Sequence, residues 1–156
     1  MSSSSADEVA PGDPFDLERF LGAQAVQYPL ALAELHEGRK RSHWIWYILP
    51  QVAGLGTSTM SRRYAIRSLD EARAYLAHPV LGTRLRDCVA ALLHHADIGA
   101  IGVLGAVDAR KLQSCLTLFG EAAEPRSIFE QALLTLYGGA RDEATLAILA
   151  RESLRS

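Results

Sequence analysis

The sequence predicts an all-α fold, a single irregular bundle of seven or eight short helices. Apolar residues recur at the spacing of one helix face, as in Leu112, Leu116 and Phe119. Residues that begin or end helices, such as Ser68 and Gly138, separate the periodic segments. No segment alternates apolar and polar residues for long enough to indicate a strand.

The N-terminal part of this bundle is predicted to hold two separate helices. Asp16 can cap a short first helix, and a second follows from about Gln27 to Glu37. Pro29 suits the first turn of that second helix, and Gly38 supplies its stop.

The next segment, His43–Leu49, is an apolar run whose length allows either a strand or a helix. Its helical surroundings favour a short buried helix that has Ser42 as its N-cap and ends at Pro50. Gln51–Ser58 contains two glycines and predicts a loop, and Thr59–Ile66 predicts one or two helical turns.

The second half of the chain predicts helices with short connections. A capping-box pattern, Ser68 to Glu71, opens the first of them, and we expect Asp108 and Asp142 to cap two others. We interpret Val89–Val107 as the end of a helix followed by a loop. The predicted helices run from Ser68 to before Pro79, from about Val80 to His95, from Asp108 through Phe119, from Ile128 to Tyr137, and from Asp142 onward.

Length and composition indicate one cytoplasmic domain. The 156 residues are 49% apolar, which is enough for a core without disulfides or a metal. We expect residues 1–14 to form a disordered tail and residues 15–152 to form the domain. The N-terminus lacks a signal-peptide pattern, and no apolar run approaches the length of a membrane span. A net charge of −2 argues against a nucleic-acid partner.

The segment Gly38–Gln51 differs in composition from the rest of the chain and predicts an anion site. Three consecutive cations precede a predicted helix N-terminus, and both tryptophans of the chain lie within the segment. Glycines that follow it would let the backbone approach a ligand. The candidate ligand-binding residues are Arg39, Lys40, Arg41, Ser42, His43, Trp44, Gln51, Gly54, Gly56, Ser58, Arg62 and Lys111.

Structural roles are the alternative for the same residues. The rings of Trp44, Trp46 and Tyr47 can be core, and the cations can belong to a solvated turn. His43 can act as an acid or base, or serve only as a hydrogen-bonded structural residue. Lys111 and Ser114 share a helix edge and can contact a ligand, activate a hydroxyl or lie on plain surface.

The residues do not assign a reaction. No nucleophile–base pair occurs at a diagnostic spacing, so whether the protein is an enzyme stays open. The adjacent histidines His94 and His95 lack the spacing of metal ligands on a helix, and no metal or cofactor is predicted. Cys88 and Cys115 fall on apolar faces, where inert core thiols are expected.

Several strings in the sequence resemble the DUF1810 family of bacterial proteins over about residues 15–149. The resemblance implies an all-helical fold and no assigned biochemical role. Some members carry the label calpastatin, a disordered repeat inhibitor that a compact helical domain does not match. The strings are Phe15-Asp-Leu-Glu-Arg-Phe20, Gly38-Arg-Lys-Arg-Ser-His-Trp-Ile-Trp46, Gly54-Leu-Gly56, Lys111-Leu-Gln-Ser114 and Tyr137-Gly-Gly139.

Three functional hypotheses follow from these residues. The first is a site for a small anionic ligand, phosphorylated or nucleotide-like, which requires the candidate residues to meet in one cleft. The second is a protein-interaction or dimerisation module, which requires exposed rings at Trp44–Tyr47. The third is a nucleic-acid contact through the basic cluster, which the acidic pI near 6.2 disfavours.

Because Cys88 and Cys115 are expected to be unpaired, a reducing agent should leave the melting temperature of the protein unchanged. Thermal denaturation followed by circular dichroism, with and without dithiothreitol, measures this. A drop of many degrees on reduction would show a stabilising disulfide instead.

Overall fold

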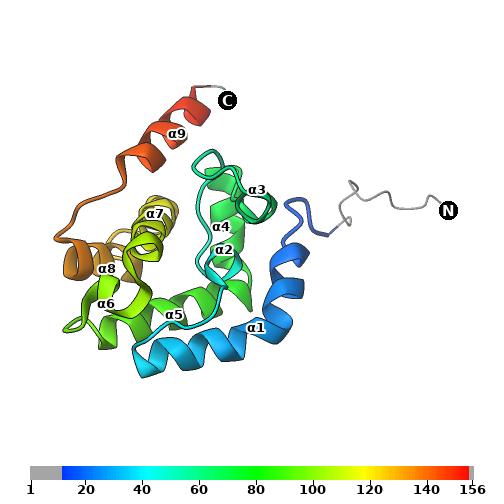
Figure 1. Ribbon diagram of the computed structural model, residues 1–156. Coiled ribbons are helices and arrows are strands. Elements are labelled where there is room, and N and C mark those ends of the chain that lie inside the picture. Colours follow the sequence, from blue (N-terminus) through cyan, green and yellow to red (C-terminus); the bar gives the residue numbers. More distant parts are fainter. Residues whose placement is uncertain (1–11, 155–156) are drawn as a thin grey trace.

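The computed structural model describes residues 12–154, so positions 1–11 of the predicted tail lie outside the described residues. The described residues form helices and no strand, which confirms the all-α prediction (Figure 1). One isolated parallel bridge joins Val52 and Ile66. The helices are α1 (Glu18–Glu37), α2 (Ile45–Ile48), α3 (Thr59–Tyr64), α4 (Leu69–Ala77), α5 (Leu81–His94), α6 (Gly99–Leu104), α7 (Ala106–Ala122), α8 (Ile128–Tyr137) and α9 (Glu143–Ser153).

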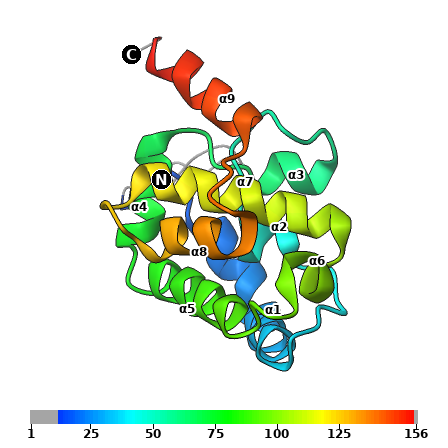
Figure 2. The same ribbon diagram turned by 90° about the vertical axis from the view of Figure 1, so that its left-hand side faces the viewer.

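Helix α7 is the centre of the core. It packs against α4, α6, α8 and α9 (Figure 2), and its residues from Ser114 to Phe119 are all buried. The ring of Phe119 lies 5.3 Å from that of Tyr75 and 5.8 Å from that of Phe129, so three helices meet in one aromatic cluster. This packing fixes the direction in which the remaining face of α7 points.

Helix α1 is continuous, so the prediction of two helices was wrong. It runs through Pro29, whose ring cannot donate a hydrogen bond to the carbonyl of Ala25. Both residues are exposed, so water can take the place of that bond. Burial of Phe20 and Leu35 against the other helices outweighs the local cost of the proline.

The guanidinium of Arg19 joins α1 to the segment that precedes α4. It donates to the carbonyl oxygen of Ala65 at 2.8 Å and to the carboxylate of Glu71 at 2.6 Å. The side chains of Arg19 and Glu71 are almost fully buried, and Glu71 also accepts from the amide of Arg67. Residues 65–71 are therefore held firmly against α1.

Three helix starts differ from the prediction. The carboxylate of Asp13, rather than Asp16, accepts from the first amides of α1. Ser42 is not an N-cap, because α2 begins at Ile45 and the Ser42 hydroxyl donates elsewhere. Asp108 lies inside the first turn of α7 and pairs with lysines. The caps predicted at Ser68 and Asp142 are confirmed.

The sequence also missed α6, which occupies a segment that was expected to be a loop. Its two glycines lowered the predicted helicity, but burial of Val103 and Leu104 against α7 stabilises the turn. The amide of Lys40 donates to the carbonyl of Val103 at 2.8 Å, which ties the basic segment to this helix.

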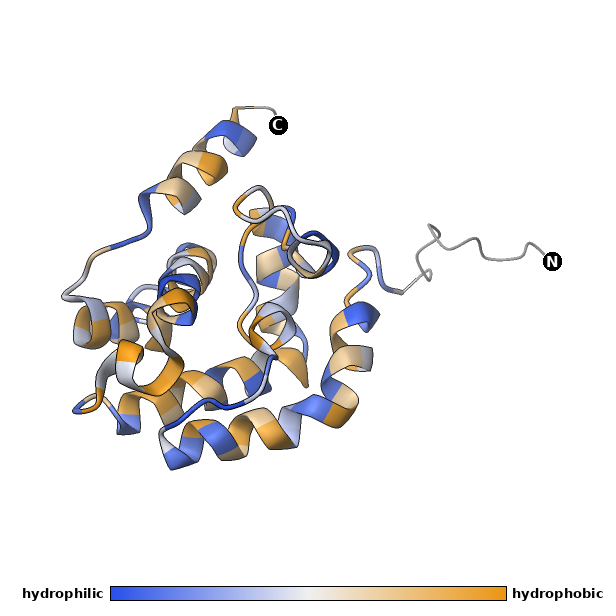
Figure 3. Cartoon of the chain, in the orientation of Figure 1, coloured by the Kyte–Doolittle hydropathy of each residue, from blue (hydrophilic) through white to orange (hydrophobic). Residues whose placement is uncertain are grey.

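Hydrophobic and hydrophilic residues alternate along α1 and α5, as expected for helices that bury one face (Figure 3). Helix α9 extends from the body, with Ile148 in contact range of Gly54. Cys88 and Cys115 are buried and unpaired, as predicted. None of the described helices is long and apolar enough to cross a membrane.

Candidate functional site

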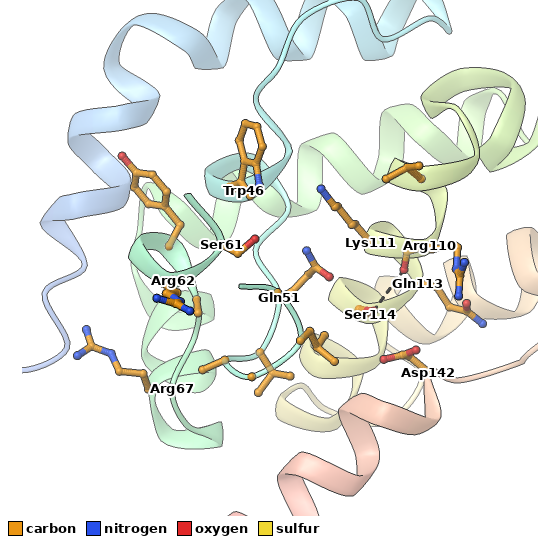
Figure 4. Close-up of a pocket in the computed structure, with 18 residues that line it drawn as sticks. Trp46, Gln51, Ser61, Arg62, Arg67, Arg110, Lys111, Gln113, Ser114 and Asp142 are labelled. Atoms are coloured by element: carbon orange, nitrogen blue, oxygen red, sulfur yellow. Dashed lines mark hydrogen bonds between the residues drawn. The ribbon is translucent and has the colours of Figure 1, made fainter. Parts of the chain in front are cut away.

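A cleft of about 530 Å³ opens between the segment Gln51–Arg67 and helix α7, near the start of α9 (Figure 4). Arg62 and Arg67 lie on one wall, and Arg110 and Lys111 lie on the other. The full lining is Trp46, Gln51, Val52, Ala53, Gly54, Leu55, Gly56, Ser61, Arg62, Tyr64, Ala65, Arg67, Val107, Arg110, Lys111, Gln113, Ser114 and Asp142.

Backbone hydrogen bonds hold the first wall in place. The amide of Ala53 donates to the carbonyl of Ile66 at 2.8 Å, and the amide of Ile66 donates to the carbonyl of Gln51 at 2.9 Å. These bonds fold residues 51–66 into a closed loop. Gly56 is needed there, because a Cβ at that position would lie 2.5 Å from the hydroxyl oxygen of Ser61.

The start of α3 presents side chains to the same wall. Ser58 caps this helix by accepting a hydrogen bond from the amide of Ser61 at 3.1 Å. Its hydroxyl also donates to that of Ser61 at 2.9 Å. Ser58 was predicted to bind a ligand, but it does not line the cleft and instead fixes α3, which carries Arg62.

The opposite wall is the face of α7 that the core leaves free. Val107, Arg110, Lys111 and Ser114 follow one another at helical spacing on this face. The ammonium of Lys111 lies 5.4 Å from the centre of the Trp46 ring, within the range of a cation–π contact. Its nearest carboxylate oxygen, from Asp108, is 3.8 Å away.

Positive charge dominates the cleft. Four of its lining side chains are cationic, and Asp142 supplies the single carboxylate among the described lining residues. That carboxylate is occupied, since it accepts from the amide and the hydroxyl of Thr145 at the start of α9. Within residues 12–154, the guanidiniums of Arg62 and Arg110 have no hydrogen bond or ion pair. The described lining therefore carries a net positive charge.

The structure divides the predicted site residues into two groups. Gln51, Gly54, Gly56, Arg62 and Lys111 come together in the cleft. The others lie outside its lining: Arg39, Lys40, Arg41, Ser42, His43, Trp44 and Ser58. Several further lining residues were not among the candidate ligand-binding residues, including Trp46, Ser61, Arg67, Arg110 and Asp142. The spacing of Val107, Arg110, Lys111 and Ser114 along one helix face is the signal that could have revealed part of this wall.

The basic segment lies outside the cleft because the carboxylate of Glu34 holds it against α1. This carboxylate accepts hydrogen bonds from the amides of Arg41 and Ser42, from the Ser42 hydroxyl and from the indole N–H of Trp44. Trp44 is consequently buried, and its ring is core. Arg39 and His43 remain exposed.

Burial by itself would raise the pKa of Glu34, but the hydrogen bonds to its carboxylate outweigh burial and lower the pKa from 4.5 to about 2. The charged form of Glu34 is therefore favoured by the folded chain. Glu37 lies three residues further along α1. It is exposed and pairs with the side chain of Arg41.

A small helical domain with a cationic cleft is the class of protein that the fold and site define. The chain belongs to the family described as "Protein of unknown function (DUF1810)", which it matches over residues 14–149. It is similar to the conserved hypothetical protein Rv1873 from Mycobacterium tuberculosis, known from a crystal structure. The two share 44% sequence identity and a TM-score of 0.86, over 88% of this chain and 99% of that one. No curated protein matches the sequence.

We expect Glu34→Gln to lower the free energy of unfolding at neutral pH by about 2 kcal/mol, because an amide cannot accept all four hydrogen bonds. The matched change Glu37→Gln should cost less than about 0.5 kcal/mol, since that pair is exposed. Urea denaturation of both variants measures the two values.

The effect of Glu34→Gln should also depend on pH. The folded pKa is lowered, so the contribution of Glu34 is fully present above pH 4.5 and is lost as the pH falls toward about 2. The difference between wild type and Glu34→Gln should therefore shrink between these values. A difference that stays constant across this range would contradict the role given to the Glu34 carboxylate.

Proposed function

We propose that the protein binds a small anionic ligand, phosphorylated or nucleotide-like, in the cleft between residues 51–67 and α7. The observation that carries the proposal is the gathering of polar groups without intramolecular partners. In the rest of the described interior, every buried side-chain nitrogen and oxygen has a hydrogen-bond partner. The unpartnered polar groups of the cleft are instead open to solvent, where a ligand can reach them.

These groups are mostly hydrogen-bond donors. The guanidiniums of Arg62 and Arg110, the indole N–H of Trp46 and the side-chain amide of Gln51 have no partner within residues 12–154. Arg62 and Arg110 are exposed, and the unpartnered polar atoms of Trp46 and Gln51 are not buried, so solvent reaches all four groups. Arginine forks match the oxygen atoms of phosphate or carboxylate, which is why we favour such a ligand.

The lining also includes flat and apolar surface. Trp46, Tyr64, Val52 and Leu55 contribute it, next to the cationic groups. A ligand with an anionic group and a ring or sugar would use both kinds of surface. A nucleotide or sugar phosphate has this composition, and a bare inorganic anion uses only half of what the cleft offers.

The alternative function, an interaction or dimerisation module, requires exposed rings at Trp44–Tyr47. Trp44 has no exposed surface and Tyr47 is 7% exposed, so these two rings do not form an apolar patch. Trp46 is half-buried and lies in the cleft. The exposure of the rings therefore favours the ligand site.

Binding, rather than a reaction, is the extent of the proposal. Among the described lining residues there is no cysteine or histidine to serve as nucleophile or base. Cys88 lies in the core instead, where burial raises the pKa of its thiol to about 12.

Anions should stabilise the folded protein. A ligand at about ten times its Kd adds roughly 1.4 kcal/mol of stability, or about 4 °C in the melting temperature of a domain of this size. A thermal-shift screen with phosphate, ribose 5-phosphate, AMP and ADP-ribose tests this. If none of these anions shifts the melting temperature at millimolar concentration, the proposed function is wrong.

Arg62→Ala should weaken binding by about tenfold or more, the equivalent of one hydrogen bond between charged groups. It should leave stability nearly unchanged, because Arg62 has no partner to lose within the described chain. The control is Arg41→Ala, which removes another exposed arginine, outside the cleft. Calorimetric titration with AMP should separate the two variants, and equal affinities would refute the location of the site.

A further inference from the structure

One carboxylate, that of Asp108, forms ion pairs with two lysines beside the cleft. Asp108, in the first turn of α7, lies 2.9 Å from the ammonium of Lys40 and 3.8 Å from that of Lys111. Lys40 comes from the basic segment after α1, and Lys111 comes from the cleft wall. The three groups carry two positive charges and one negative charge, so the cluster has a net charge of +1.

The two lysines share the carboxylate unequally. The side chain of Lys40 is 7% exposed, forms the short contact with Asp108 and donates to the carbonyl of Ser42. Its ammonium also lies 4.9 Å from the centre of the Trp44 ring. Lys111 is 28% exposed, and at 3.8 Å it is too far from Asp108 for a hydrogen bond. Lys40 therefore neutralises Asp108, and the charge of Lys111 is left over.

The position of this leftover charge matters for binding. Arg67, on the other wall, is 64% exposed and lies 3.6 Å from Glu71, so solvent and a nearby carboxylate both weaken its attraction for a ligand. Lys111 is mostly enclosed and touches the indole of Trp46, so water screens its charge less. Arg62 and Arg110 are exposed like Arg67, so solvent screens their charges as well. Lys111 is the least exposed of the four cations, so an anion gains most at the end of the cleft beside Trp46.

We propose that the anionic group of the ligand, a phosphate or carboxylate, binds at Lys111, and that Lys40 makes this possible from behind the cleft by occupying Asp108. Lys40 is then a positioning residue that sets the charge of the site without contacting the ligand. This inference rests on the proposed function. It also gives the basic segment a role in the site, although that segment does not line the cleft.

The net charge of Lys40, Asp108 and Lys111 can be changed by substitution. In Lys40→Met, Asp108 pairs with Lys111 instead, the cluster becomes neutral and binding should weaken by about tenfold. In Asp108→Asn, both lysines lose their counter-charge and binding should tighten severalfold. In the double variant Lys40→Met/Asp108→Asn, the net charge returns to +1 and affinity should return to within about threefold of wild type.

The experiment is calorimetric titration of the full chain with AMP, repeated with ribose 5-phosphate. Lys111→Met serves as the variant that removes the anion contact itself. Arg39→Met is the matched control, since it removes a neighbouring positive charge from an exposed side chain outside the cleft. Circular dichroism confirms that each variant is folded.

Three results have distinct meanings. If neither compound binds the wild type, the proposed function fails and the inference fails with it. If Lys111→Met loses binding but Lys40→Met binds like Arg39→Met, the proposed function stands and the role of Lys40 is refuted. Should Lys40→Met not fold, Asp108→Asn and the double variant decide: a double variant that binds as poorly as Lys111→Met overturns the inference, and restored affinity supports it.

Discussion

The carboxylate of Glu34 is the interaction on which the arrangement of the site depends. It accepts hydrogen bonds from two amides, a hydroxyl and an indole N–H, all of them in residues 41–44. A buried carboxylate is costly unless it is fully hydrogen-bonded, and this requirement allows the segment few other conformations. Trp44 is thereby placed in the core and Lys40 beneath α7. The partner that Lys40 finds there, Asp108, connects this loop to the cleft wall.

The other wall depends on a second buried charge. Arg19 binds the carbonyl of Ala65 and the carboxylate of Glu71, which keeps the end of the 51–66 loop close to α1. One wall of the cleft is thus anchored by Arg19, and the Lys40–Asp108 pair connects the segment held by Glu34 to the other wall. Among the cations that face the cleft, Arg62 and Arg110 have no partner within residues 12–154. Arg67 and Lys111 have only longer contacts, with carboxylates that Arg19 and Lys40 already bind. The frame thus holds fully partnered charges, and the cleft holds charges that are weakly partnered or free.

The sequence predicted the helices well where local signals decide them and poorly where packing does. Ser68 and Asp142 cap helices through neighbours three residues away, so their patterns could be interpreted directly. Pro29 and the glycines of α6 argue locally against helix, and only burial against distant segments overrides them. Only part of the candidate site could be predicted, for the same reason. Gln51, Arg62 and Lys111 are in the cleft, but no local pattern shows that Glu34 turns the Arg39–Trp44 segment away from it.

The behaviour of the basic segment shows why a run of cations is weak evidence for a binding surface. Its three consecutive cations have three different environments: Arg39 is exposed, Lys40 is buried on Asp108, and Arg41 pairs with Glu37. Arg110 and Lys111 attract less notice in the sequence, yet both face the cleft. The packing of each element decides which charges face the cleft, and the partners that a charge already has decide how strongly it acts there. A charge that is satisfied internally contributes little to a ligand directly, but it can still determine which of its neighbours remains unsatisfied, and Lys40 stands in that relation to Lys111.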